Sequence, residues 1–186
     1  MPIARSKLGI QLNLKIDEIA PGRPNRPGTP LSASLITVHN TDNPKPSADA
    51  EAHARFLKNT GYYVHNGKKI WVSWHYTVDD DSCVRHLPLN EVGWHASSKT
   101  GNASSLGIEI CMNAGIDQAM AFDRAAKLIA CLCFDMGLDP ATQIVPHYRW
   151  SEKNCPSLLM TGGKPGKKWR DFVAAVAAIE AEIVPG

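Results

Sequence analysis

Short apolar runs separated by amphipathic stretches give the chain the pattern of an α/β protein. Residues 35–39 form a β-branched run with little alternation, which is typical of a strand buried on both faces. Residues 106–112 form a second such run, apolar except for one glutamate. Residues 71–78 and 83–87 predict two more strands, which the Asp-Asp-Asp-Ser turn at 79–82 joins as a hairpin.

Three other stretches have helical periodicity. Residues 48–59 follow Ser47, a candidate N-cap, and predict the first helix. Residues 118–136 predict a long, largely buried helix that Gly137 closes, and residues 169–183 predict a final helix with an Ala/Val/Ile face. A chain of 186 residues can bury one core, so we expect a single α/β domain.

The first thirty residues differ from the rest. Four prolines within residues 21–30 are interleaved with glycine and arginine, so residues 1–30 predict an irregular arm packed on a domain formed by residues 31–186. Inside this arm, residues 8–14 alternate between apolar and polar side chains and favour an edge strand. A long polar segment, residues 88–105, predicts a functional loop.

Composition excludes several classes of protein. Charged residues make up 20% and hydrophobic residues 44% of the chain, and the net charge of +2 is too small to indicate nucleic-acid binding. No apolar window is long enough for a membrane span, and the N-terminus has no signal-peptide core. The five cysteines lack paired spacings, so all but Cys155 are expected to be reduced core residues, which fits synthesis in the cytoplasm. We also expect the protein to be a monomer.

One loop near the end of the chain offers metal-binding chemistry. His147 and Cys155 lie eight positions apart, and Lys153 adds a cation two positions before the cysteine. His39 ends the first predicted strand and could supply a third ligand from the interior. Two imidazoles, one thiolate and an open position suit a catalytic zinc ion. The spacing alone is common, and packing roles are the usual ones for such residues.

The motifs around these residues are more specific than the spacing. In order they are His39-Asn40-Thr41, Trp74-His75-Tyr76, Gly93-Trp94-His95-Ala96, Leu106-Gly107-Ile108-Glu109-Ile110 and the segment 147–156. Together they resemble the type-2 N-acetylmuramoyl-L-alanine amidases, a zinc family that includes phage endolysins, wall-recycling amidases and animal peptidoglycan recognition proteins. The resemblance covers residues 31–160. It implies a central mixed β-sheet flanked by helices, one zinc ion, and hydrolysis of the bond between N-acetylmuramic acid and L-alanine in bacterial peptidoglycan.

The resemblance also suggests catalytic roles. Glu109 lies in an apolar strand, where burial raises the pKa of a carboxyl group and suits it to accept and return a proton. Some members of the family use a tyrosine at the position of Trp74 instead, and this chain lacks it. Lys153 is expected to stabilise the oxyanion that forms during attack. Four more residues are expected to contact substrate: Trp94, His95, Asn40 and Thr41.

The remaining polar residues have simpler interpretations. His53, His65 and His86 are predicted to lie on the surface, and His75 to be a hydrogen-bond partner behind the site. The acidic residues of the turn 79–82 are predicted to be solvated.

Two alternative functions remain. A recognition module of the same fold would bind peptidoglycan without cutting it, although all three ligand positions and Glu109 are filled here. A cysteine hydrolase would use Cys155 as nucleophile and His147 as base. Wall-recycling relatives often have aspartate where Cys155 stands, so the cysteine favours intact cell wall as substrate. Without an export signal, an enzyme of this kind would reach the wall through a holin-type partner or cell lysis.

Overall fold

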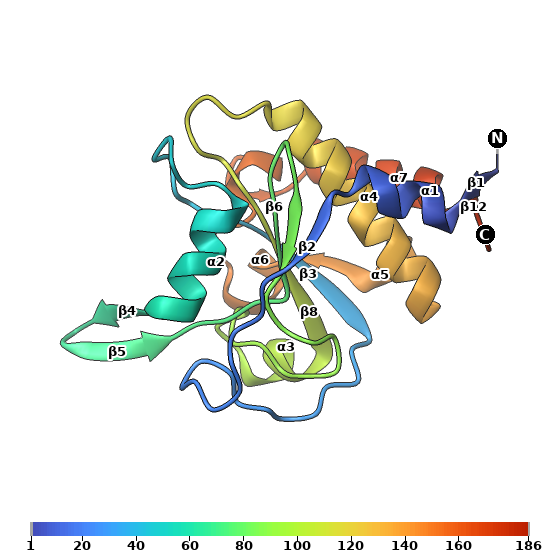
Figure 1. The fold of residues 1–186 in the computed structure, drawn as a ribbon. Helices are drawn as coiled ribbons and strands as arrows, with labels where there is room; N and C mark the ends of the chain where they lie inside the picture. Colours follow the sequence, from blue (N-terminus) through green and yellow to red (C-terminus); the bar gives the residue numbers. More distant parts are fainter. Residues whose placement is uncertain (1, 186) are drawn as a thin grey trace.

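A six-stranded mixed β-sheet flanked by helices forms the body of the protein in the computed structural model, which describes residues 2–185 (Figure 1). In spatial order the strands are β2 (Leu14–Ile16), β7 (Cys83–Arg85), β6 (Tyr76–Val78), β8 (Ser105–Ile110), β3 (Leu35–Asn40) and β9 (Ile144–Pro146). Strands β6 and β7 are antiparallel, and the other neighbours are parallel. The expected mixed α/β architecture is confirmed.

Helices cover both faces of this sheet. Helix α4 (Gln118–Met136) packs on one face, and α7 (Lys167–Glu180) packs against α4. Helix α2 (Ala50–Asn59) covers part of the other face (Figure 1). The shorter helices are α1 (Arg5–Gln11), α3 (Lys99–Ser104), α5 (Pro140–Gln143), α6 (Tyr148–Ser151) and the 3₁₀ turn η1 (Ser157–Leu159). Three two-stranded ribbons complete the fold: β1 (Ile3–Ala4) with β12 (Ile183–Val184), β10 (Met160–Thr161) with β11 (Lys164–Pro165), and β4 (Tyr62–His65) with β5 (Lys68–Trp71).

Alternation along β3 and β8 gives the sheet one apolar and one polar face. Val38 and Ile108 join the apolar core against α4, so His39 and Glu109 point to the opposite face. The parallel register pairs His39 directly with Glu109. The sheet therefore holds an imidazole and a carboxylate side by side on its polar face.

The predicted helices are largely confirmed. Helix α4 has the expected bounds, and Gly137 closes it in the left-handed conformation with φ of +66°. Helix α2 begins two residues later than predicted, because the side chain of Asp49, rather than that of Ser47, caps it by accepting a hydrogen bond from the Ala52 amide at 2.7 Å.

The N-terminal region is more regular than the sequence predicted. The predicted strand over residues 8–14 is wrong, because α1 occupies most of it and buries Leu8 and Leu12 on one side at helical spacing. The edge strand begins only at Leu14 and runs parallel to β7. Residues 1–30 are therefore not irregular throughout, since part of this segment belongs to the main sheet.

Two other features bear on the composition. All five cysteines are buried and free of disulfides, as expected. None of the helices formed by residues 2–185 is long and apolar enough to cross a bilayer.

The first residue of the acidic turn between β6 and β7, Asp79, has a structural role and is not solvated as predicted. Asp79 is buried, and its carboxylate accepts hydrogen bonds from the amides of Ala50 at 2.8 Å, Asp81 at 2.9 Å and Ser82 at 2.7 Å. It therefore ties the start of α2 to the β6–β7 turn.

Replacing Asp79 with alanine is expected to lower the free energy of unfolding by about 2–3 kcal/mol, since three buried amides lose a charged acceptor. Urea denaturation measures this change. Asp81→Ala is the matched control, because the Asp81 side chain is 78% exposed and its loss should cost less than about 0.5 kcal/mol. Equal stabilities of the two variants would contradict the structural role of Asp79.

Candidate metal centre and active site

A groove of about 660 Å³ opens on the polar face of the sheet. Every residue that the sequence nominated for the site lines it: His39, Asn40, Thr41, Trp94, His95, Glu109, His147, Lys153 and Cys155. These residues come from the end of β3, from β8, from the loop before α3 and from the loop after β9. The fold therefore brings together positions up to 116 residues apart.

Three of these residues could hold a metal ion. Candidate ligand atoms of His39, His147 and Cys155 all lie within 4.8 Å of one another, and all three side chains are buried. The Cys155 Sγ atom lies 3.8 Å from His39 Nδ1, and the two imidazole centroids are 4.6 Å apart. Both ring nitrogens of His147 are buried without a hydrogen-bond partner among the described residues. A metal ion between these atoms would bind one of the two unpaired His147 nitrogens, so the three residues fit a metal site.

The loop after β9 places two of the candidate ligands. The His147 amide donates to the Val38 carbonyl at 3.1 Å, which fixes the start of the loop against β3. After the single turn of α6, Glu152 adopts a left-handed conformation with φ of +56°, and the chain reverses. The Tyr148 amide then donates to the Cys155 carbonyl at 3.0 Å. This contact brings the two ends of the loop together beside β3.

A relay of hydrogen bonds sets the tautomer of His39. His95 Nε2 lies 3.2 Å from the Ser105 carbonyl, which can only accept, so His95 Nε2 carries the proton and His95 Nδ1 is the acceptor. His39 Nε2 lies 3.1 Å from that acceptor and therefore donates to it. The free lone pair of His39 Nδ1 faces Cys155 and Glu109, as a metal ligand requires. Gly107 makes room for the relay, because a Cβ atom there would lie 2.6 Å from the His95 ring.

Burial keeps the two candidate histidine ligands neutral. It lowers the pKa of His39 well below the usual value, and it lowers that of His147 to about 4, so both offer lone pairs at neutral pH. Burial and the nearby Glu109 carboxylate raise the pKa of the Cys155 thiol to about 12. This thiol therefore needs a nearby positive charge to become a thiolate.

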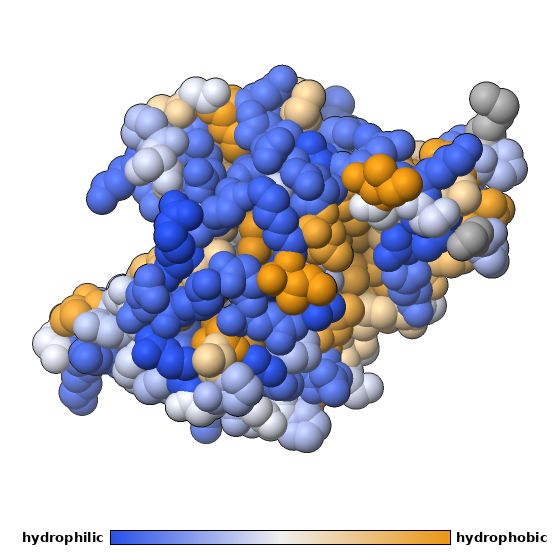
Figure 2. Space-filling view, in the orientation of Figure 1, coloured by the Kyte–Doolittle hydropathy of each residue, from blue (hydrophilic) through white to orange (hydrophobic). Residues whose placement is uncertain are grey.

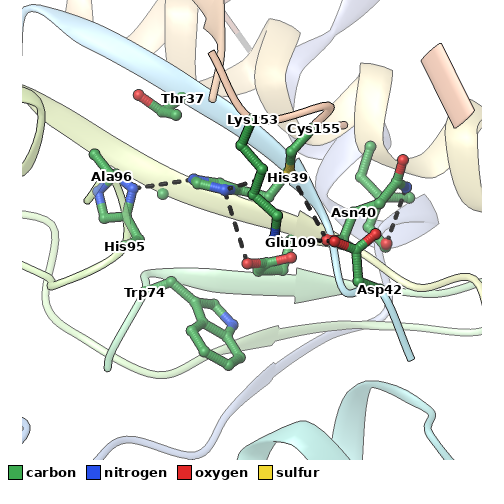
Figure 3. A network of polar contacts seen from close by, with 12 residues as sticks. Thr37, His39, Asn40, Asp42, Trp74, His95, Ala96, Glu109, Lys153 and Cys155 are labelled. Atoms are coloured by element: carbon green, nitrogen blue, oxygen red, sulfur yellow. Dashed lines mark hydrogen bonds and ion pairs between the residues drawn. The ribbon is translucent and has the colours of Figure 1, made fainter. Parts of the chain in front are cut away.

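Glu109 lies at the edge of this cluster. Its Oε1 atom is 3.9 Å from His39 Nδ1, and the side chain is 14% exposed towards the groove (Figure 3). Burial raises the pKa of Glu109 to about 8, although the Lys153 ammonium opposes the shift. A carboxyl group with such a pKa can both accept and donate a proton near neutrality. The geometry therefore places a candidate metal-binding triad beside a carboxyl group that could carry a proton.

Comparison with known protein families matches residues 28–158 to the N-acetylmuramoyl-L-alanine amidases. The chain belongs to this family. The match spans the amidase groove from His39 through Cys155, so it includes all the residues described above.

Relatives and solved structures agree with this assignment. The chain is 43% identical over 167 residues to N-acetylmuramoyl-L-alanine amidase XlyA of Bacillus subtilis, covering 89% of this chain and 51% of XlyA. It is 39% identical over 170 residues to the amidase CwlH of the same organism, covering 90% of this chain and 62% of CwlH. The solved catalytic domain of XlyA superposes with a TM-score of 0.76 over 88% of this chain and 99% of that domain. The chain thus spans about half to three fifths of these relatives' own length.

Lys153 lies at the rim of the amidase groove. Its ammonium pairs with the Asp42 carboxylate at 3.0 Å, and the side chain is 54% exposed (Figure 3). Partial burial lowers the pKa of Lys153, but the hydrogen bond and the charge of Asp42, together with nearby Cys155 and Glu109, outweigh burial and raise the pKa above its usual value. Lys153 is therefore a fixed positive charge at neutral pH. Sequence reasoning missed Asp42, which lies only two positions after the Asn40 of the first motif.

The residues expected to contact substrate are not equally free to do so. The Asn40 amide donates to the Ile110 carbonyl at 3.2 Å and accepts from the Leu158 amide at 3.0 Å, so both of its ends are engaged. His95 is committed to the relay described above. Trp94 and Thr41 line the groove, but the Thr41 hydroxyl is buried, without a hydrogen-bond partner among the described residues. Contacts from these four residues to substrate remain predictions.

Trp74 takes the position where some amidases of this family have tyrosine. Its indole nitrogen donates to the Thr77 hydroxyl at 2.7 Å, and the side chain is buried at the groove wall. An indole cannot replace a phenol as a proton donor and acceptor. Trp74 therefore offers no alternative to Glu109 as a candidate proton carrier in this groove.

Two histidines are buried that the sequence predicted to be on the surface. His53 on α2 lines the groove and is buried. Its Nδ1 atom donates a hydrogen bond to the carbonyl of Asp49, the N-cap of the same helix, at 2.8 Å. His86 is fully buried, with Nε2 at 2.8 Å from the Thr77 hydroxyl. His65 is exposed as predicted. His75 bonds to the Gly107 amide and the Glu91 carbonyl, each at 2.9 Å, so it supports β8 rather than a metal ligand.

Proposed function

We propose that this chain is a zinc-dependent N-acetylmuramoyl-L-alanine amidase that cleaves the amide between N-acetylmuramic acid and L-alanine in bacterial peptidoglycan. The observation that carries the proposal is the His39, His147 and Cys155 cluster with the Glu109 carboxylate 3.9 Å from His39, in one groove. Two imidazoles and a thiolate are a ligand set that zinc accepts. The relatives named above are amidases of the same name.

The chain's own residues have distinct roles in this reaction. A bound zinc ion would acidify water and polarise a carbonyl oxygen. Glu109 accepts the proton of the attacking water and passes it to the leaving nitrogen, which becomes the amino group of L-alanine. Lys153 places its charge where negative charge develops on the carbonyl oxygen. His95 keeps the proton of His39 on Nε2, away from the ligand cluster.

A cysteine hydrolase is less well supported by the same geometry. A nucleophilic cysteine needs a lowered pKa and a base in hydrogen-bond contact. Here burial raises the pKa of Cys155 to about 12, and its sulfur contacts His39 rather than the proposed base His147.

The decisive experiment combines metal analysis with product analysis. We expect purified protein to contain about one zinc ion per chain and to release L-alanine amino termini from purified peptidoglycan. A chelator should abolish this release and added zinc restore it, whereas a thiol alkylator should have little effect on zinc-loaded protein. Peptidoglycan binding without zinc and without new amino termini would replace the amidase with a recognition module. Activity that survives chelation but not alkylation would indicate the cysteine hydrolase.

A further inference from the structure

The hairpin of β4 and β5 is the one part of the groove that does not belong to the main body of the described structure. It pairs with no strand of the six-stranded sheet and projects from the molecule below α2 (Figure 1). Asn66 and Gly67 form its turn with φ of +49° and +73°, as a tight two-residue hairpin connection requires. At its base the Val72 amide donates to the Gly61 carbonyl at 2.9 Å.

Side-chain contacts on the outer face of the hairpin stabilise it. The rings of Tyr62 and Trp71 meet edge to face with centroids 5.0 Å apart, and the Lys69 ammonium lies 4.3 Å above the Tyr62 ring. Isolated two-stranded hairpins are only marginally stable in water, and aromatic and cation–π contacts of this kind stabilise them. These contacts use the face that carries Tyr62, Lys69 and Trp71, of which Trp71, at the base of the hairpin, also lines the groove. The side chains of the other face take no part in them.

The inner face continues the catalytic groove. Tyr63 and Ile70 lie directly opposite each other in the register, and both line the same groove as Glu109. Their side chains are nevertheless 54% and 37% exposed. Figure 2 shows hydrophobic atoms on this projection, among largely hydrophilic neighbours. An exposed apolar pair that extends a groove is suited to bind part of the ligand.

The charge of the hairpin indicates which part of the substrate it binds. Residues 62–71 contain Lys68 and Lys69 but no acidic residue. Lys68 pairs with His65, two positions beyond Tyr63, and therefore shares the inner face. In peptidoglycan the peptide attached to the muramic acid bears free carboxylates and small aliphatic groups, whereas the glycan offers hydroxyl and acetamido groups and its lactyl carboxyl is taken up by the amide to the peptide. An apolar pair with an ammonium beyond it is complementary to the peptide.

We propose that Tyr63, Ile70 and Lys68 on the inner face of the β4–β5 hairpin bind the stem peptide of the substrate beyond its L-alanine. This inference rests on the proposed function, because it takes peptidoglycan as the substrate. The apolar pair packs against the aliphatic part of the peptide, and Lys68 meets a carboxylate farther along it. The hairpin thereby makes the enzyme sensitive to the length of the peptide.

Soluble N-acetylmuramoyl peptides of increasing length test this proposal. The measured quantity is the ratio of kcat/KM for a muramoyl tripeptide to that for N-acetylmuramoyl-L-alanine. We expect this ratio to fall about tenfold in the double variant Tyr63→Ala/Ile70→Ala, which loses apolar contact only with the longer substrate. Lys68→Ala should lower it several-fold at low salt and less at high salt. Val64→Ala is the matched control, because Val64 is exposed on the outer face of the same hairpin.

The outcomes separate this proposal from the proposed function. An unchanged ratio in the double variant would overturn the peptide assignment, and so would a loss that follows the number of sugars instead of the number of amino acids. Calorimetric titration with the same tripeptide in the Glu109→Gln background gives a readout free of turnover, and adding Tyr63→Ala/Ile70→Ala should weaken binding at least several-fold. If wild type releases no amino termini from any substrate, the amidase proposal fails, while the titration still decides whether the hairpin binds peptide.

Discussion

Glu109→Gln is expected to lower the rate at which L-alanine amino termini are released by about 10²- to 10⁴-fold, the range that a general base contributes, while zinc content stays the same. Glutamine fills the same space on β8 but cannot accept a proton. The carboxylate lies near the ligand cluster without being one of its three buried candidate ligands, so its loss should leave metal binding intact. The rate and the zinc content should be measured on one preparation.

Glu152→Gln is the matched control for this variant. Glu152 is exposed on the loop that carries His147 and Cys155, so its neutralisation removes a negative charge near the site without changing the groove. We expect its rate to stay within about twofold of wild type, because exposed charges interact weakly. A Glu109→Gln variant that loses its zinc would instead make Glu109 a metal ligand. One that keeps full activity would remove Glu109 from the mechanism.

Cys155→Ala is expected to lose both zinc and activity, since two imidazoles alone hold the ion poorly. Cys155→Asp is expected to keep zinc and part of the activity, because a carboxylate oxygen is also a zinc ligand. A nucleophilic cysteine would give a different pattern, in which both variants are equally inactive and both retain the metal. Zinc analysis together with amino-terminus release distinguishes the two roles.

Cys131→Ala controls for the loss of a buried thiol. Cys131 lies on α4 in the apolar core, away from the groove. Its variant should lose about 1 kcal/mol of stability, as expected for a small buried deletion, but no zinc. If Cys131→Ala also lost the metal, the effect of Cys155→Ala would reflect general destabilisation.

The candidate site could be predicted from sequence because five separated motifs resemble the amidase family, and two of its residues also stand out within recognisable elements. His39 ends a β-branched run, and Glu109 interrupts an apolar one, so each side chain was conspicuous against its neighbours. The register that pairs them, and the hydrogen bond from His39 to His95, depend on tertiary contacts that no local pattern encodes. The role of His95 behind a ligand was therefore missed, although the residue itself was singled out.

Local patterns failed where short segments were ambiguous. Residues 8–14 fit both an alternating strand and a helix that buries Leu8 and Leu12, and packing against α4 decided for the helix. His53 and His86 were assigned to the surface because histidine is commonly polar and exposed, yet both are buried with hydrogen-bond partners. The β4–β5 hairpin had a usable signal that was overlooked, the Asn66-Gly67 pair between two runs of aromatic and β-branched residues.

The parallel pairing of β3 also governs when the site can exist during biosynthesis. β3 lies between β8 and β9, and Ile36 pairs with Leu106 on one side and Ile144 on the other. The ligand cluster joins residues 116 positions apart, so a nascent chain lacks it until the ribosome has passed Cys155. Such long-range pairings form slowly. If the cluster binds a metal as proposed, it can do so only after Cys155 has been made, and a chain that ends before Cys155 would lack one of the three candidate ligands.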